Sequence, residues 1–272
     1  MNVGLFIPCY IEQFYPQVGL ATARVLNRYG ATVQYPPGQT CCGQPMANMG
    51  CTDAARPVAQ HFLDLFADYD YVVGPSGSCV SMIRNHYGGL IADRQRLDKL
   101  RNKTFELCEF LYDVLEIRHL KGRFPYQVGL HQGCHGLREL KLGSPSERVL
   151  EHFNKVRSLL ETLEGIRFSP LERPDECCGF GGTFSVSEEA VSCMMARDRI
   201  QDHQQSGTEV LTSVDMSCLM HLEGMLRRAA VNSETVLAAG RAFDVSRVHG
   251  KGTGVQGPMR VMHVAEIMVE SA

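Results

Sequence analysis

Cysteine is the residue type of this sequence with the most chemistry to offer. The 272 residues contain 11 cysteines, and eight of them form two sets of four that repeat in the same order. Each set has one cysteine after an apolar stretch, then a Cys-Cys-Gly triplet, then a cysteine preceded by serine. The first quartet is Cys9, Cys41, Cys42 and Cys79, and the second quartet is Cys134, Cys177, Cys178 and Cys218. Four thiolates saturate a Zn²⁺ ion or a simple iron–sulfur cluster, so each quartet predicts one metal centre.

The Cys-Cys-Gly triplets are geometrically demanding. Two adjacent sulfurs face one centre only where the backbone turns sharply, and Gly43 and Gly179 permit a positive φ there. The competing interpretation treats each cysteine as a small buried hydrophobic residue. That interpretation fits the three cysteines without a counterpart in the other half, which are Cys51, Cys108 and Cys193. It does not explain two matching sets of four.

Composition narrows the class of protein. The hydrophobic fraction of 44% and charged fraction of 21% are ordinary, which excludes a disordered chain. A net charge of -3 with scattered Lys and Arg excludes general attraction to nucleic acid. The start has no basic leader segment, and no run of 18 apolar residues could span a membrane. We therefore expect a cytoplasmic protein whose thiols stay reduced, where clustered cysteines indicate metal or redox chemistry and not disulfides.

Alternating short strands and helices must position these cysteines. The predicted strands are residues 3–7, 32–35, 71–73, 126–131, 166–171 and 209–214. The predicted helices are residues 18–29, 54–66, a helix from about 79, 105–117, 146–153, 156–163, a helix opened by a capping box at 185–188 and ending at 207, 218–229 and 261–269. This alternation predicts an α/β fold with short parallel sheets. Ligands of such sheets gather where strands end, which is where most of the eight cysteines fall.

The repeat also predicts the domain organisation. The same order of strands and cysteines in both halves indicates a duplicated α/β domain, with residues 1–124 forming one copy and residues 125–272 the other. We expect the copies to be related by a pseudo-twofold axis, with the metal sites near the interdomain region.

Several polar residues are candidates for tuning the centres. His131, His135 and Arg138 surround Cys134, and cationic or hydrogen-bonding side chains stabilise an anionic cluster. His131 has two further interpretations, as a metal ligand or as an acid/base group. The alternative for all three is an ordinary polar strand end. The glycines at 252, 254 and 257 match a dinucleotide fingerprint, but no strand precedes them and Pro258 follows, so residues 247–258 are predicted to be a mobile loop.

Five blocks carry a resemblance to a known family. They are FIPCY at 6–10, QTCCGQP at 39–45, GPSGSC at 74–79, CCGFGG at 177–182 and SCLM at 217–220. The chain resembles the CCG-domain family, which includes a cysteine-rich subunit of heterodisulfide reductase, the iron–sulfur subunit of glycolate oxidase, and subunits of lactate utilisation systems. The resemblance to the last group implies an iron–sulfur electron-transfer subunit of a complex that oxidises L-lactate to pyruvate. It also implies a ferredoxin-like iron–sulfur subunit and a third subunit as partners, with membrane association only through those partners.

The sequence departs from its heterodisulfide reductase relatives at two positions. There each motif ends in Cys-x-x-Cys and supplies a fifth thiolate to a non-cubane cluster, whereas here Ser76 and Asp215 stand at the first of those positions. Four cysteines per half fit an ordinary [4Fe–4S] centre in each domain, or Zn²⁺ at one or both sites, to which Asp215 could add an oxygen. Three functions stay open: the lactate-oxidation subunit, a heterodisulfide-reductase-like thiol/disulfide redox subunit, and a zinc-binding structural or assembly subunit. No catalytic residue is assigned.

Overall fold

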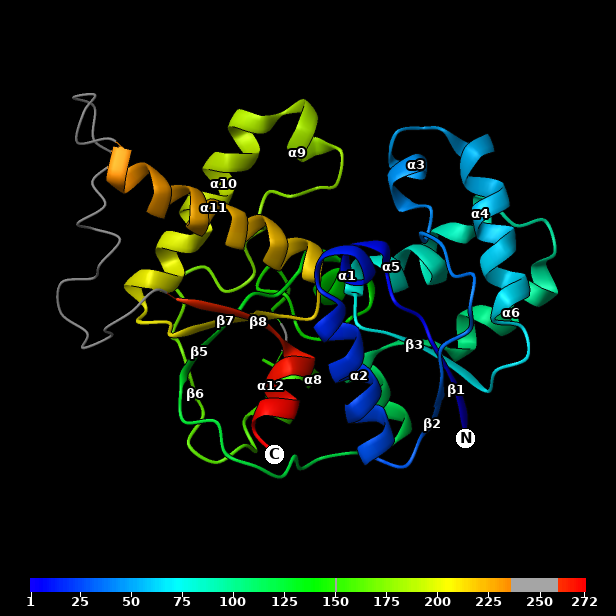
Figure 1. The fold of residues 1–272 in the computed structure, drawn as a ribbon, viewed down its shortest axis with the longest axis horizontal. Coiled ribbons are helices and arrows are strands. Elements are labelled where there is room, and N and C mark those ends of the chain that lie inside the picture. The colour runs from blue at the N-terminus through cyan, green and yellow to red at the C-terminus, as the bar shows by residue number, and fades with distance from the viewer. Residues whose placement is uncertain (150, 236–258) are drawn as a thin grey trace.

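The computed structural model describes residues 1–149, 151–235 and 259–272, and side chains over the same residues except 229–235. The loop predicted at residues 247–258 lies outside the described residues. Two halves lie side by side, with the N-terminal half on the right of Figure 1 and the C-terminal half on the left.

Each half is built on a four-stranded sheet in which every pairing is parallel. The first sheet has the order β2-β1-β3-β4 and the second has the matching order β6-β5-β7-β8. The first sheet comprises β1 (Asn2–Leu5), β2 (Thr32–Gln34), β3 (Tyr71–Gly74) and β4 (Thr104–Glu106). The second comprises β5 (Gln127–Leu130), β6 (Arg167–Phe168), β7 (Val210–Ser213) and β8 (Arg260–His263). The predicted duplicated α/β fold with parallel sheets is confirmed.

Helices connect the strands in both halves. The first half has α1 (Cys9–Phe14), α2 (Pro16–Arg28), α3 (Gln44–Asn48), α4 (Thr52–Leu65), α5 (Gly77–Ser81), η1 (Met82–His86), η2 (Tyr87–Gly89), α6 (Arg94–Lys103), α7 (Leu107–Glu109) and η3 (Phe110–Val114). The second has η4 (His135–Glu139), α8 (Lys155–Leu160), α9 (Phe184–Ser187), α10 (Glu189–Gln205), α11 (Met216–Thr235) and α12 (Val264–Glu270). Of these, η1, η3 and η4 are single π-helical segments and η2 is a 3₁₀ turn.

The last strand of each sheet corrects the sequence prediction. The sequence pattern predicts helices over residues 105–117 and 261–269, but both segments begin inside β4 and β8. The polar residue that ends each strand accepts a hydrogen bond from the following helix: Glu106 from the N–H of Cys108 at 2.7 Å and His263 from the N–H of Ala265 at 3.2 Å. Because strand and helix follow without a loop, their apolar residues form one continuous run in the sequence.

Two helix predictions in the second half are also wrong. The described part of residues 146–153 contains no helix, and Ser146 is held by the Asp175 carboxylate through its N–H at 2.7 Å and its hydroxyl at 2.9 Å. The capping box at 185–188 is absent because Ser185 lies inside α9 and donates its hydroxyl to the carbonyl of Gly182 at 2.8 Å. The long helix α10 begins one residue after that box.

The two halves contact each other through equivalent positions. Ser76 and Asp215 occupy equivalent positions after β3 and β7, and they pair with each other in an antiparallel bridge. One apolar core extends through both halves and includes Val3 of β1 and Val210 of β7. Helix α2 packs on α12 (Figure 1). The boundary predicted at 124/125 lies between η3 and β5 and stays a prediction. Gly122 is required there, because a Cβ at this φ of 136° would lie 2.0 Å from the carbonyl oxygen of Ser271.

Candidate metal centres between the two halves

The eight cysteines of the two quartets line one cavity. This cavity opens to solvent, lies between the halves and has a volume of about 120 Å³. The two quartets come from separate parts of the sequence, and the structure brings them to the two sides of this single space. The other three cysteines do not line it: Cys108 is buried in the core, Cys193 is half-buried on α10 and Cys51 is exposed.

Strand ends position each quartet. Cys9 and Cys134 follow β1 and β5 and begin a helical turn, while Cys79 and Cys218 lie in the helices that follow β3 and β7. The carboxyl ends of parallel strands meet at one edge of a sheet, so these cysteines converge there. The Cys-Cys-Gly triplets lie in the loops after β2 and β6 and complete each quartet.

The glycines of the triplets have the predicted left-handed backbone. The φ angles are 82° at Gly43 and 86° at Gly179. A Cβ at Gly179 would lie 2.7 Å from the carbonyl oxygen of Ser192, so only glycine fits there. The turns aim backbone N–H groups at sulfur: Gly43 donates to Cys41 Sγ and Gly179 to Cys177 Sγ, both at 3.4 Å.

The first quartet holds its thiols close enough to couple their ionisation. Hydrogen bonds from Cys42 and Cys9 lower the pKa of Cys41 to about 3. The pKa of Cys9 is raised by its hydrogen bond with Cys41 and by burial, and the pKa of Cys42 is raised by hydrogen bonds with Cys41 and Cys79 and by burial.

The second quartet repeats this pattern. Hydrogen bonds from Cys134 and Cys178 lower the pKa of Cys177 to about 2. The pKa values of Cys134 and Cys178 are raised by their hydrogen bonds with Cys177 and by burial, and for Cys178 also by a hydrogen bond with Cys218. Removing all four protons would place four negative charges in one half-buried group, which requires a compensating cation. The donor set therefore fits a thiolate-bound metal or iron–sulfur cluster in each half.

Ser76 and Asp215, at the two positions considered above for a fifth thiolate, both act as helix caps. The hydroxyl of Ser76 accepts from the N–H of Cys79 at 3.3 Å. Asp215 Oδ1 accepts from the N–H and hydroxyl of Ser217 at 3.2 and 2.8 Å, and its Oδ2 accepts from the N–H of Ser78 in the other half at 2.7 Å. Both carboxylate oxygens of Asp215 thus accept hydrogen bonds: Oδ1 caps the start of α11, and Oδ2 links the two halves.

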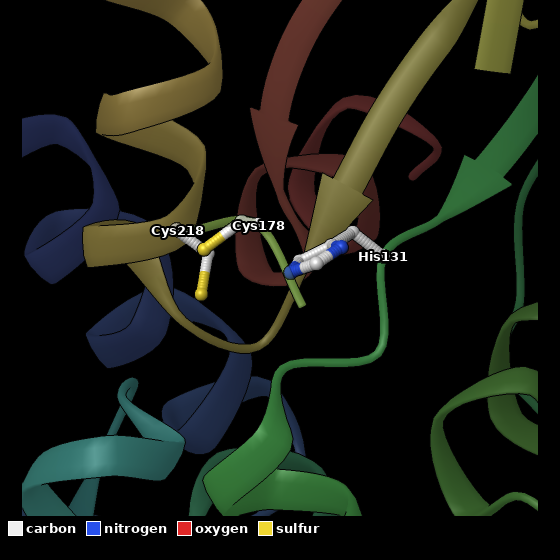
Figure 2. A group of neighbouring side chains, drawn as sticks. All are labelled: His131, Cys178 and Cys218. Atoms are coloured by element: carbon white, nitrogen blue, oxygen red, sulfur yellow. The ribbon is translucent and has the colours of Figure 1, made fainter. Parts of the chain in front are cut away.

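His131 lies against the second quartet. Its ring points toward the sulfurs of Cys178 and Cys218, as Figure 2 shows, and one ligand-type atom from each of the three residues lies within 4.8 Å of the others. The ring is buried, with 1% of its surface exposed, and its Nδ1 accepts from Arg199 Nε at 3.3 Å. Burial and the Arg199 charge lower the pKa of His131 to about 3, so the imidazole is neutral.

The other two predicted neighbours of Cys134 lie in different environments. His135 lines the cavity, with its Nδ1 3.7 Å from Cys134 Sγ and its Nε2 3.3 Å from the side-chain amide nitrogen of Gln44 in the first half. Arg138 does not line the cavity. Its guanidinium binds Glu147 with two hydrogen bonds of 2.6 and 3.0 Å.

The sequence prediction missed a buried ion pair behind the second quartet. Arg199 and Asp202 on α10 are 0% and 3% exposed and are joined by a 2.8 Å contact. The Asp202 carboxylate accepts from the N–H groups of Glu172 and Arg173, and Arg199 also donates to the Arg173 carbonyl. The pair therefore fixes the loop that leads to Cys177. No sequence signal marks it, because charged residues three apart on a helix are ordinary surface features.

Comparison with known proteins agrees with this arrangement. The family model for the CCG cysteine-rich domain matches residues 3–84 and 128–223, one range in each of the two halves described above. The chain belongs to the CCG family of cysteine-rich domains.

Relatives in this family are similar over nearly the whole chain. The chain is 37% identical to Lactate utilization protein A of Exiguobacterium sp. over 99% of its own length and 97% of the relative's. It is 36% identical to Lactate utilization protein A of Bacillus subtilis, covering 85% of this chain and 94% of that protein. The predicted resemblance to the CCG family, and to its lactate-utilisation members, is confirmed.

One solved structure shares the fold at low identity. The crystal structure of a hypothetical protein from Helicobacter pylori superposes with a TM-score of 0.57 at 12% identity over 99% of this chain. The chain spans 48% of that protein's length. Among the described residues, no helix is both long and apolar enough to cross a membrane.

Proposed function

We propose that this chain is the iron–sulfur redox subunit of a lactate utilisation system, and that it carries electrons released when L-lactate is oxidised to pyruvate. The observation that carries the proposal is the convergence of two cysteine quartets on one solvent-open cavity. The names of the relatives support the link to lactate utilisation. We assign a [4Fe–4S] cluster to each quartet, four thiolates being the number that this cluster takes.

Two features favour a cluster over zinc. A cluster of four irons and four sulfides needs more room than a single Zn²⁺ ion, and these quartets border a cavity that opens to solvent. Backbone N–H groups also point at cysteine sulfur in both halves, from Gly43, Gly179 and, at 3.5 Å from Cys178 Sγ, Phe180. Hydrogen bonds to sulfur are one of the means by which proteins set the potential of a cluster.

The chain's own residues have defined tasks in this role. When bound, the clusters supply one-electron transfer. The eight cysteines hold them, and the backbone donors stabilise their negative charge. Asp215 joins the halves by accepting a hydrogen bond from the N–H of Ser78. The open cavity is the place where the ferredoxin-like iron–sulfur subunit or the third subunit would exchange electrons with this chain.

A zinc-binding structural role is the second candidate. It is favoured by one observation, the approach of His131, Cys178 and Cys218 to within 4.8 Å, because two thiolates and an imidazole are common zinc ligands. A heterodisulfide-reductase-like role has less support. The two positions of the fifth thiolates are taken by Ser76 and Asp215, and both are committed to capping.

Metal analysis of the anaerobically purified chain separates these functions. We expect roughly four irons and four acid-labile sulfides per half, with an EPR signal after reduction. About one zinc per half without sulfide would refute the redox function and establish the structural one. For the pathway, a strain lacking the gene should fail to grow on L-lactate and recover with the wild-type gene, and normal growth of the deletion strain would contradict the assignment.

A further inference from the structure

The two halves place different side chains at equivalent positions beside their cysteines. Equivalence is given by the backbone: the N–H of Phe6 bonds the carbonyl of Val73 at 2.9 Å, and the N–H of His131 bonds the corresponding carbonyl of Thr212 at 2.8 Å. Both residues stand three positions before the first cysteine of their quartet. Directly after that cysteine, the first half has Tyr10 where the second has His135. At both positions an aromatic residue in one half therefore corresponds to an imidazole in the other.

Arg199 determines where the proton of His131 resides. A guanidinium Nε always carries its hydrogen, so its 3.3 Å contact with His131 Nδ1 requires a lone pair on Nδ1. The proton of the neutral ring is then on Nε2. This Nε2 has no hydrogen-bond partner among the described residues, although the side chain is only 1% exposed. The ring points at the sulfurs of Cys178 and Cys218 (Figure 2), so His131 presents an N–H donor, and not a free lone pair, to the second quartet.

His135 is arranged in the same sense from the opposite side. The side-chain amide nitrogen of Gln44 lies 3.3 Å from His135 Nε2, and when this N–H donates to Nε2 the proton of the neutral ring is on Nδ1. That Nδ1 lies 3.7 Å from Cys134 Sγ. Two imidazole rings therefore face the second quartet, in addition to the backbone donors of its Cys-Cys-Gly loop.

The first quartet has no such pair. Phe6 carries no donor and packs edge-on against Phe62, with the ring centroids 4.9 Å apart. Tyr10 turns its ring toward Phe180 at 5.9 Å; it lies near the four thiols, whose charges, after burial, raise its pKa, but its hydroxyl is not hydrogen-bonded to any described sulfur. The backbone N–H of Gly43 is the counterpart of Gly179. The second half also has the N–H of Phe180 on Cys178 Sγ, and it has the Asp215 carboxylate where the first half has Ser76; the charge of Asp215 is shared among the N–H groups of Ser78 and Ser217 and the hydroxyl of Ser217.

From this asymmetry, and resting on the proposed function, we infer that the two centres have different reduction potentials and that the centre of the second quartet has the higher one. Donors aimed at sulfur stabilise the additional negative charge of a reduced cluster. With clusters bound, a difference of this sign would favour transfer of one electron from the first centre, which would be oxidised, to the second, which would be reduced, with no bond or proton exchanged. His131 and His135 are then residues that tune the potential, and the second quartet is the point from which the electron leaves the chain.

The test begins with the wild-type chain, purified anaerobically. A redox titration followed by EPR should resolve two centres with separate midpoint potentials. Pulsed EPR on protein carrying ¹⁵N-histidine should show weak coupling to histidine nitrogen at the higher-potential centre only. Equal potentials would overturn the inference, and so would the strong coupling of a nitrogen bonded directly to metal. Absence of iron and sulfide would instead refute the proposed function.

Two variants replace a histidine of the second half with the residue at the equivalent position of the first half, so each tests one difference between the halves. His131→Phe should lower the midpoint potential of the higher-potential centre. At a fixed applied potential its oxidised-to-reduced ratio should rise about tenfold, which corresponds to about 59 mV for one electron. His135→Tyr should shift the same centre in the same direction, and because His135 is half-exposed this variant does not depend on repacking the core. Tyr10→Phe is the control and should leave this centre unchanged. If neither histidine variant moves it, the histidines do not tune the centre.

Discussion

The two halves of this protein share a ligand frame and differ in what surrounds it. Strand order, the order of four cysteines and the left-handed glycine of the Cys-Cys-Gly loop are the same in both. Behind the first quartet lies an aromatic cluster that includes Phe6, Phe62 and Tyr87, whereas behind the second lies the polar network of His131 and Arg199. Strand ends and tight turns suffice to gather four thiols, and the neighbouring side chains are free to diverge.

The same division appears at the last strand of each sheet. Glu106 and His263 occupy equivalent positions, since each ends its strand and accepts from the N–H of the residue two positions later. An acid in one half and a base in the other thus perform one structural task. Their titration runs in opposite directions because burial penalises the charged form of both. Duplication has preserved the geometry here and changed the electrostatics.

Loss of one cysteine from either quartet is expected to have the largest effect. Cys41→Ser should remove the first centre and leave the second, and Cys178→Ser should do the reverse, because each quartet completes its ligand set within its own half. Iron and sulfide analysis with EPR would show about half the wild-type content in each variant.

Cys51→Ser is the control for this comparison, since Cys51 is exposed and does not line the cavity. Its metal content should equal that of the wild type. Unchanged iron in both Cys41→Ser and Cys178→Ser would show that the quartets are not the ligands.

The cysteines were predictable from the sequence and the network behind them was not. Their residue type is rare and their order repeats, so the pattern could be found without knowing which residues are buried. Arg199 has no such signal, because its importance comes from being fully buried against His131. The strands β4 and β8 were missed because each has only three or four residues and continues directly into a helix. Sequence periodicity cannot separate two elements that share one apolar run.

Replacing Arg199 in the second half should lower the free energy of unfolding more than replacing Phe62 in the first half. Arg199→Met leaves the Asp202 carboxylate buried without its cation, which typically destabilises by about 3–5 kcal/mol. Phe62→Leu, in the aromatic cluster, should cost only about 1 kcal/mol because volume is nearly conserved. Urea unfolding of the metal-free, reduced chain measures both.

The double variant Arg199→Met with Asp202→Leu sharpens this prediction. Replacing both members of a buried pair is often close to neutral, so the double variant should recover much of the lost free energy of unfolding. A double variant as unstable as Arg199→Met alone would show that the cost arises from the loop carrying Cys177 and not from the unpaired carboxylate.

The two residues at the fifth-thiolate positions should differ by a smaller amount. Asp215→Ala leaves the buried N–H of Ser78 and that of Ser217 without an acceptor, at a cost of about 2–3 kcal/mol. Ser76→Ala removes a single cap and should cost about 1 kcal/mol. The free energy of unfolding from urea titration decides the order, and equal costs would mean that the bond between the halves adds no stability.

The stability of the two halves is also expected to depend on pH with opposite sign. Burial raises the pKa of Glu106 to about 8, so its contribution favours the folded state at low pH and is lost as pH rises from about 4.5 to 8. Burial lowers the pKa of His263 to about 4, so its contribution is lost as pH falls from about 6.5 to 4. Each amounts to about 1 kcal/mol per pH unit within its window.

Neutral substitutes that keep a hydrogen-bond acceptor isolate each contribution. Glu106→Gln should flatten the decline in unfolding free energy between about pH 6 and 8 without changing the acid side, and His263→Asn should do the reverse between about pH 6 and 4. Urea midpoints of the metal-free chain across that range provide the measurement. If both variants keep the pH dependence of the wild type, other groups cause it. Glu106 and His263 would then differ in residue type but not in their effect on stability.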